Sequence, residues 1–242
     1  MHLKSKVLMA GFSLFLLMAV TNNCFAQRFG RNIKGNGNII KENRNVSDFT
    51  KLEISGAFKV FMVQGTKPSL AVEADENLME RIITTVKGGR LDISSHNVSS
   101  YNKMVIYLCV VDLDELDISG AVTVIGETEL KFRSIHLDFS GASRMDADMI
   151  AEKINVDISG ASKINLAGNC RTAEVDASGA SKFLGTKFKV DNLSADVSGA
   201  SFVEICVKDD MEVEVSGTGK LRYEGNPRVR QSTSGLGKIV QL

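Results

Sequence analysis

An acidic residue recurs three positions before the glycine of a repeated Ser-Gly motif, and this is the strongest chemical pattern in the 242-residue chain. The acids are Glu53, Asp117, Asp138, Asp157, Asp176, Asp196 and Glu214. Carboxylates at defined separations serve polysaccharide-active enzymes as acids and bases, and they also ligate Ca²⁺. Because these acids repeat together with the motif, the stacking of similar repeats explains them without catalysis. We therefore predict no catalytic residue, no metal ligand and no cofactor.

A polysaccharide lyase or glycosidase stays open as the alternative, and it would need acids that break the repeat. Two clusters do so, Asp112, Asp114, Glu115 and Asp117 in one, and Asp146 with Asp148 in the other. Charged loops usually face solvent, and both His96 and His136 are isolated in the sequence. The chain has no P-loop, nucleophile elbow, Cys-x-x-Cys or His-Glu-x-x-His motif.

A second row of side chains lies three positions after each motif glycine, and most of its members are basic. The whole row is Lys59, Thr123, Arg144, Lys163, Lys182, Phe202, Lys220 and Lys238. We expect the two rows to offset one another through pairs such as Asp157 with Lys163. Phe202 should face outward at the position where the other repeats carry a cation or Thr123. The predicted binding residues are Phe202, Lys163, Lys182, Lys220, Asp138, Asp157, Asp176 and Asp196.

The spacing of the repeat predicts the elements that hold these rows. The glycines at 120, 141, 160, 179, 199, 217 and 235 lie 18–21 residues apart. Apolar residues alternate with polar ones on either side of each glycine, which is the behaviour of strands with one buried face. The pattern predicts an all-β protein, a parallel β-helix (β-solenoid) of 18–21 residues per coil. Each coil should hold two or three short strands, with glycine at a bend and the following alanine inside the corner.

The chain divides into three parts. Residues 1–26 read as a signal peptide, with Lys4 and Lys6 before an apolar run and cleavage after Ala26. Lipidation of Cys24 is the alternative, and either reading makes the protein exported, to the periplasm, the cell surface or the medium. Residues 27–45 are a polar lead-in, and residues 46–242 form one domain. Within this domain, residues 46–113 are irregular first coils and residues 114–242 are the regular repeats. A helical stretch is expected at Asn77–Val86. The step of 64 residues from Gly56 to Gly120 should correspond to about three coils.

Composition excludes several partners. The 29 basic and 29 acidic residues cancel, which argues against nucleic acid. After the signal peptide no apolar segment could span a membrane. Cys109, Cys170 and Cys206 form no disulfide pattern and are expected to be buried free thiols. The chain has no Trp and three Tyr, which disfavours the aromatic platform of a carbohydrate-binding module.

Several phrases resemble one bacterial family. They are Val46-Ser-Asp-Phe-Thr-Lys-Leu-Glu-Ile-Ser-Gly-Ala, Val72-Glu-Ala-Asp-Glu-Asn-Leu, Gly88-Gly-Arg-Leu and the Ser-Gly-Ala-Ser repeats. Together they are similar to the "head GIN domain" family, secreted proteins of unknown function that are named auto-transporter adhesins and are common in the Bacteroidetes. The resemblance covers nearly the whole chain after the signal peptide. It implies a right-handed parallel β-helix and no catalytic residues.

These observations favour a non-enzymatic module of the cell envelope that binds or adheres to a polysaccharide or a cell-surface protein. A polysaccharide-active enzyme is the first alternative to this reading, and a structural scaffold of the envelope is the second. The repeat register continues to Leu242 without a polar cap. We therefore expect homodimerisation through the coil at residues 221–242.

Overall fold

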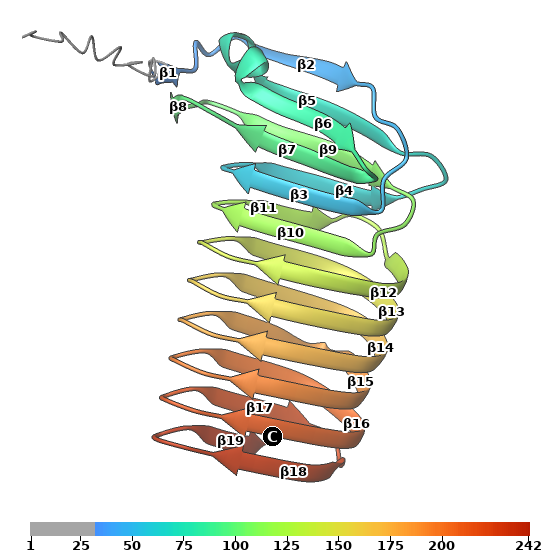
Figure 1. The fold of residues 1–242 in the computed structure, drawn as a ribbon, viewed down its shortest axis with the longest axis vertical. Coiled ribbons are helices and arrows are strands. Elements are labelled where there is room, and N and C mark those ends of the chain that lie inside the picture. Colours follow the sequence, from blue (N-terminus) through green and yellow to red (C-terminus); the bar gives the residue numbers. More distant parts are fainter. Residues whose placement is uncertain (1–31) are drawn as a thin grey trace, which may run out of the picture. The chain divides into compact units, whose positions relative to one another are not determined.

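The computed structural model describes residues 32–242, so the predicted signal peptide and Cys24 lie outside the described residues. Nearly all of the described elements are strands, stacked as a β-solenoid of about seven turns (Figure 1). The predicted all-β solenoid is therefore confirmed. No helix among these residues is long and apolar enough to cross a membrane.

Four of the regular coils each contain one long strand rather than the predicted two or three short ones. These strands are β13 (Arg144–Ile158), β14 (Lys163–Ala177), β15 (Lys182–Val197) and β16 (Phe202–Val215). Each runs along one wall of the solenoid, bends, and returns along the other wall (Figure 1). Shorter strands complete the stack, namely β10 (Glu115–Gly120), β11 (Thr123–Gly126), β12 (Leu130–Phe139), β17 (Lys220–Glu224), β18 (Arg228–Thr233) and β19 (Lys238–Gln241). All of these pair in parallel with equivalent positions facing each other.

The Ser-Gly corners join one strand to the next, and their glycines stack in one column. Gly160 has a φ of +67°, and a Cβ there would lie 2.5 Å from the carbonyl oxygen of Gly141. Only glycine meets both conditions, because other residues are strained at this φ and their Cβ would strike the neighbouring coil. The recurring glycine is therefore required by the backbone.

The prediction that alanine fills the inside of the corner is wrong. Ala142 and Ala161 are exposed on the rim. The residue that turns inward is the next serine, buried at Ser143, Ser162 and Ser181. The Oγ of Ser143 donates a hydrogen bond to the carbonyl oxygen of Ser140 at 3.0 Å. The hydroxyl thus gives a corner carbonyl a hydrogen-bond partner.

The coils are not stacked in the order of the sequence. Strands β3 (Lys51–Gly56) and β4 (Lys59–Gln64) pair directly with β10 and β11, and Gly56 faces Gly120. The prediction of about three coils between these glycines is therefore wrong. The intervening residues fold away to the outer side of β3 and β4. There β7 (Arg90–Ser95) places Ile93 opposite Ile54, so the degenerate motif at residues 92–95 does stack as a repeat.

The intervening residues build an N-terminal cap. Its elements are β5 (Ser69–Asp75), the 3₁₀-helix η1 (Glu76–Arg81), β6 (Ile82–Lys87), β7, β8 (Val98–Ser100) and β9 (Met104–Val110). Residues of the lead-in add β1 (Ile33–Lys34) and β2 (Ile39–Arg44), of which β2 pairs antiparallel with β5. Helix η1 lies across the end of the solenoid with Leu78 and Met79 buried (Figure 1). The cap thus closes this end of the core.

The helical stretch predicted at Asn77–Val86 is wrong in its second half. Only the single 3₁₀-helix forms, and residues 82–87 are strand β6. The β-branched run from Ile82 to Val86 favours a strand over a helix. Asn77 does not cap the helix, since its Oδ1 accepts from the amide of Asn36 and its Nδ2 donates to the carbonyl oxygen of Lys34.

The core lies between the two walls and is filled by the predicted apolar columns. Ile158, Val156 and Ile164 are almost fully buried, as are the larger Phe139 and Phe183. Burying one such side chain contributes about 1.5–3 kcal/mol. The repeated columns are therefore the main source of stability in the regular coils.

Candidate functional site

The two rows of charge lie on opposite walls of the solenoid. We call Glu53, Asp117, Asp138, Asp157, Asp176, Asp196 and Glu214 the acid column, which the strand register places on the wall of β3, β10 and β18. We call Lys59, Thr123, Arg144, Lys163, Lys182, Phe202, Lys220 and Lys238 the basic column, which runs along the wall of β4, β11 and β19. In Figure 1, β11 and β19 lie behind β10 and β18.

The expected pairing of the two rows is wrong. Among the described residues, no ion pair of 4.0 Å or less joins an acid of the acid column to a cation of the basic column. The strands before and after each corner run along different walls, so Asp157 and Lys163 face opposite sides. Each wall therefore keeps a single sign of charge along its column.

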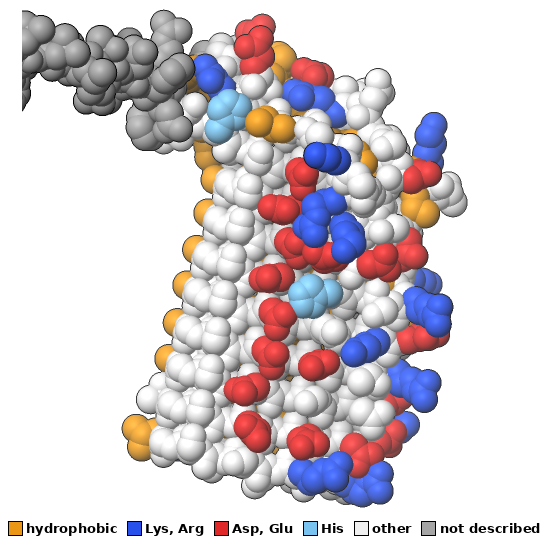
Figure 2. All heavy atoms as spheres, viewed as in Figure 1, with side chains coloured by type: hydrophobic (Ala, Val, Ile, Leu, Met, Phe, Trp, Pro, Cys, Tyr) orange, Lys and Arg blue, Asp and Glu red, His pale blue; other side chains and the backbone are white. Residues whose placement is uncertain are grey.

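The acid column is visible as a continuous line of carboxylates (Figure 2). Register pairs place Asp138 beside Asp157, and Asp157 beside Asp176. Neighbouring parallel strands are about 4.8 Å apart, so these charges repel one another. Partial burial, and then the adjacent carboxylates, raise the pKa of Asp138 and of Asp176 above the ordinary 3.8.

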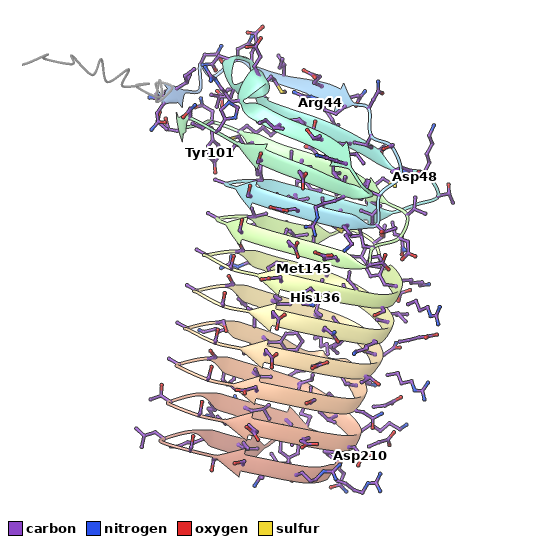
Figure 3. All side chains as sticks on the ribbon, in the orientation of Figure 1. Arg44, Asp48, Tyr101, His136, Met145 and Asp210 are labelled. Atoms are coloured by element: carbon purple, nitrogen blue, oxygen red, sulfur yellow. The ribbon has the colours of Figure 1, made fainter. Side chains whose placement is uncertain are left out.

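A shallow groove runs beside the lower part of the acid column. It has a volume of about 580 Å³. Its lining comprises four acids, Asp138, Asp157, Asp176 and Asp196, and the corner serines Ser159, Ser178, Ser198 and Ser216, with Ile158 and Ala177. The four predicted acids therefore share one groove. His136, labelled in Figure 3, places its Nε2 3.5 Å from a carboxylate oxygen of Asp157.

The upper end of the acid column is ion-paired with Arg90, a residue that the sequence did not single out. Its guanidinium lies 2.6 Å from Asp117, 2.5 Å from Glu115 and 3.2 Å from Glu53. Lys51 lies 2.6 Å from Glu115, and these partners lower the pKa of Glu115 to about 2. The two-residue Gly88-Gly89 turn, in which both glycines have positive φ, directs β7 so that Arg90 reaches this position.

The acid clusters considered for catalysis do not form an open site. Glu115 and Asp117 belong to the ion-pair cluster of Arg90. Asp146 accepts a hydrogen bond from the side-chain amide of Asn165 at 2.9 Å. Among residues 32–242, no group of three or more His, Cys, Asp or Glu side chains is placed to hold a metal ion.

The basic column carries Phe202 as expected, between Lys182 on one neighbouring strand and Lys220 on the other. Phe202 is half-buried and shares the outward side of β16 with Glu204. Within the described part of the chain, Lys163, Lys182 and Lys220 make no ion pair. The lysines therefore extend from a wall on which nothing of opposite charge holds them.

Two outward aromatic rings on the basic wall were not anticipated. Phe61 and Tyr107 lie on neighbouring strands and stack with ring centroids 5.6 Å apart. The Nζ atoms of Lys41 and Lys59 lie over the Tyr107 and Phe61 rings, 3.8 and 4.7 Å from their centroids. The period-2 pattern Phe58-Lys-Val60-Phe61-Met62 is the signal that places Phe61 outward, opposite the buried Val60 and Met62.

The cap has its own polar centre at Asp75, which is fully buried. Its carboxylate accepts hydrogen bonds from the amides of Gly37, Asn102 and Lys103 and from the side-chain amide of Asn102. Although burial opposes ionisation, these four bonds together lower the pKa of Asp75 to about 2. Asp75 therefore ties β5 to the lead-in and to the segment before β9.

The cysteines are free, as predicted, but only Cys170 is buried, and burial raises the pKa of its thiol. Cys109 and Cys206 are half-buried because both lie at outward strand positions. Residues 221–242, the expected dimer contact, expose Leu236 and Leu242. The dimer stays a prediction.

Comparison with known proteins gives one family. The family model described as "Putative auto-transporter adhesin, head GIN domain" matches residues 48–227. No curated protein matches the chain.

Several solved structures share the fold. A "putative adhesin" from Bacteroides fragilis is 21% identical, with a TM-score of 0.82 over 87% of this chain and all of that one. A "putative adhesin" from Parabacteroides distasonis is 22% identical, with a TM-score of 0.70 over 87% of this chain and 99% of that one. A "putative lipid binding protein" from the same species is 19% identical, with a TM-score of 0.71 over the same shares.

The family match covers most of the regular repeats and most of the cap, and the expected resemblance is thereby confirmed. The chain belongs to the family described as "Putative auto-transporter adhesin, head GIN domain".

Proposed function

We propose that this protein is an exported, non-enzymatic binding module whose charged walls adhere to a polymer or a protein at the cell surface. Membership of an adhesin family supports a binding role. The ligand is met by the sides of the regular coils. There, among the described residues, the acid column from Asp138 onward and the basic column have no Lys, Arg, Asp or Glu partner of opposite sign.

One observation carries this proposal: like charges stack through successive coils without compensation. Asp138, Asp157 and Asp176 face one another across neighbouring strands, and Lys163 faces Lys182 in the same way. Like charges directly opposite one another destabilise a sheet. A fold that keeps them gives up stability, and such local conflicts are expected at functional sites.

Binding of the purified protein to an array of glycans and matrix proteins tests the proposal. We expect specific capture of at least one component, and loss of that capture when either the lysines or the aspartates of the regular coils are replaced. Absence of capture in all conditions would contradict adhesion and favour a structural scaffold in the envelope. Shortening of a glycan on the array would contradict the non-enzymatic part of the proposal.

A further inference from the structure

We propose that the basic wall binds a linear acidic polysaccharide that lies along the solenoid axis, one sugar residue per coil. This inference rests on the proposed function and specifies its face and its ligand. It starts from the basic column between Arg144 and Lys238, which presents five cations and Phe202 on six successive strands.

The surroundings of the basic column leave its charge available. The next outward row, two residues further along each strand, is mostly uncharged or neutralised. Its members are Ile125, Asp146, Asn165, Leu184, Glu204 and Arg222. Glu204 lies 3.8 Å from Arg222, and Asp146 is hydrogen-bonded to Asn165. The wall therefore has a net positive surface that suits an anionic ligand.

The spacing of the cations distinguishes between linear polyanions. Adjacent strands place the column residues about 4.8 Å apart. An extended acidic peptide presents side chains on one face only about every 6.6 Å. Such a peptide does not stay in register with the column for more than a few coils. One pyranose residue of an extended polysaccharide is close in length to one strand separation, so a uronic acid polymer lying along the column advances by about one sugar per coil.

Aromatic groups favour the same ligand. Phe202 interrupts the cations and offers a half-buried apolar surface on which the C–H face of a sugar ring can pack. The acid column has no aromatic member. This difference selects the basic wall as the saccharide face.

A hollow at the upper end of the basic column supplies a place for the end of the polymer. It has a volume of about 430 Å³ and adjoins the column through Lys59 and Thr123. The exposed Tyr101 and the polar Asn102 also line it, and Tyr101 lies near the corner side of the cap (Figure 3). The hollow is suited to a single acidic sugar residue, because it is lined by the ring of Tyr101, the amide of Asn102, the hydroxyl of Thr123 and the cation of Lys59.

The acid column does not prevent this binding. The two walls of a packed β-structure lie about 10 Å apart, which is near the Debye length of about 8 Å at physiological salt. The carboxylates of the opposite wall are therefore largely screened from a polymer on the basic wall. They do repel a second strand of the same polymer, so binding is confined to one face.

Equilibrium binding to polygalacturonate, which carries a carboxylate on every sugar, tests the inference. We expect Lys163→Glu/Lys182→Glu to lower the affinity by about tenfold or more, because two attractive contacts become repulsive. The matched control is Lys67→Glu/Lys87→Glu, which changes the net charge equally at exposed positions outside the basic column and should alter the affinity less than about twofold. The affinity of the unaltered protein should fall steeply with added salt.

Further variants address the aromatic contacts and the fold. Phe202→Ala and Tyr101→Ala should each weaken binding by about threefold to tenfold without changing the salt dependence. Lys163→Gln/Lys182→Gln should give an intermediate loss, and it keeps the test available if the charge reversal disturbs folding. Circular dichroism of each variant confirms the β-structure.

Neutral dextran and poly-L-glutamate serve as comparison polymers. The inference is overturned if both lysine double variants bind polygalacturonate like the unaltered protein, or if poly-L-glutamate binds as tightly as polygalacturonate. If the protein does not bind polygalacturonate but captures another array component through the acid column, this inference is overturned and the proposed function stands. Absence of binding to every component contradicts both proposals.

Discussion

The N-terminal cap and the regular coils use polar side chains in different ways. In the cap, charged groups make specific short contacts: Asp75 accepts four hydrogen bonds, and Arg90 joins three carboxylates. In the regular coils, Asp138, Asp176 and Lys182 repeat without such partners. Stability there comes from apolar columns and stacked corners. Charge is thus structural in the cap, whereas in the coils it is left without ion-pair partners, as the proposed binding requires.

The largest expected effect is the loss of a corner glycine. In Gly141→Ala the new Cβ would lie 2.5 Å from the carbonyl oxygen of Gly120 at a φ of +76°. Backbone strain and the steric clash should together cost about 3 kcal/mol of unfolding free energy, measured by denaturant titration. Gly88→Ala is the matched control, because its φ of +58° is similar and nothing lies within 4 Å of the new Cβ. It should cost about 1 kcal/mol. Equal losses in the two variants would contradict the close-approach argument.

The next effect concerns the polar centre of the cap. Asp75→Asn replaces an oxygen acceptor by an amide donor that faces other donors, and we expect it to cost about 2 kcal/mol. The exposed Asp48→Asn should leave the free energy of unfolding nearly unchanged. If both substitutions have the same small effect, the cap does not depend on Asp75.

Acid should separate the two regions. The folded pKa of Asp75, about 2, lies below its ordinary 3.8, so its stabilisation is present above pH 3.8 and is lost as the pH falls towards 2. Asp138 and Asp176 have raised pKa values, so they destabilise at neutral pH and this cost disappears as the pH falls towards 3.8.

Site-resolved hydrogen exchange measures both trends. Protection in the regular coils should rise between pH 7 and pH 4. Protection in β2 and β5 should fall below pH 4. Loss of protection in both regions at the same pH, already above pH 4, would contradict the assignment of separate roles.

The smallest effect is a gain. Asp138→Asn/Asp176→Asn removes repulsion along the acid column and should stabilise the protein by about 0.5–1 kcal/mol at pH 7. Asp148→Asn is the control, because Asp148 faces Ala167 rather than another acid. A destabilised double variant would show that the acid column contributes to the fold.

Much of the fold could be predicted because every regular coil repeats the same local pattern of apolar, polar and glycine residues. The apolar columns at residues such as Val156 and Ile158, the glycine at each corner and the outward position of Phe202 all follow from local sequence pattern. A parallel stack then brings equivalent positions together, so the acid groove was also predictable.

The rest depends on contacts between segments that are distant in sequence. The pairing of Gly56 with Gly120 could not be predicted from the number of residues between them, because the intervening residues leave the stack and form the cap. The contact of Arg90 with Asp117 depends on that excursion. The separation of the acid and basic columns depends on which wall each strand follows, and spacing around a corner does not specify this.

The central claim is that the regular coils bind while the cap holds the fold. We would measure capture of polygalacturonate and of the full array by three variants: Lys163→Glu/Lys182→Glu, Asp138→Asn/Asp176→Asn, and Arg90→Gln in the cap. The account predicts that the lysine variant no longer captures polygalacturonate. The aspartate variant should no longer capture any component that binds the acid column. Arg90→Gln should keep both kinds of capture but have a lower free energy of unfolding. Full capture by both column variants, with loss of capture in a folded Arg90→Gln protein, would contradict it.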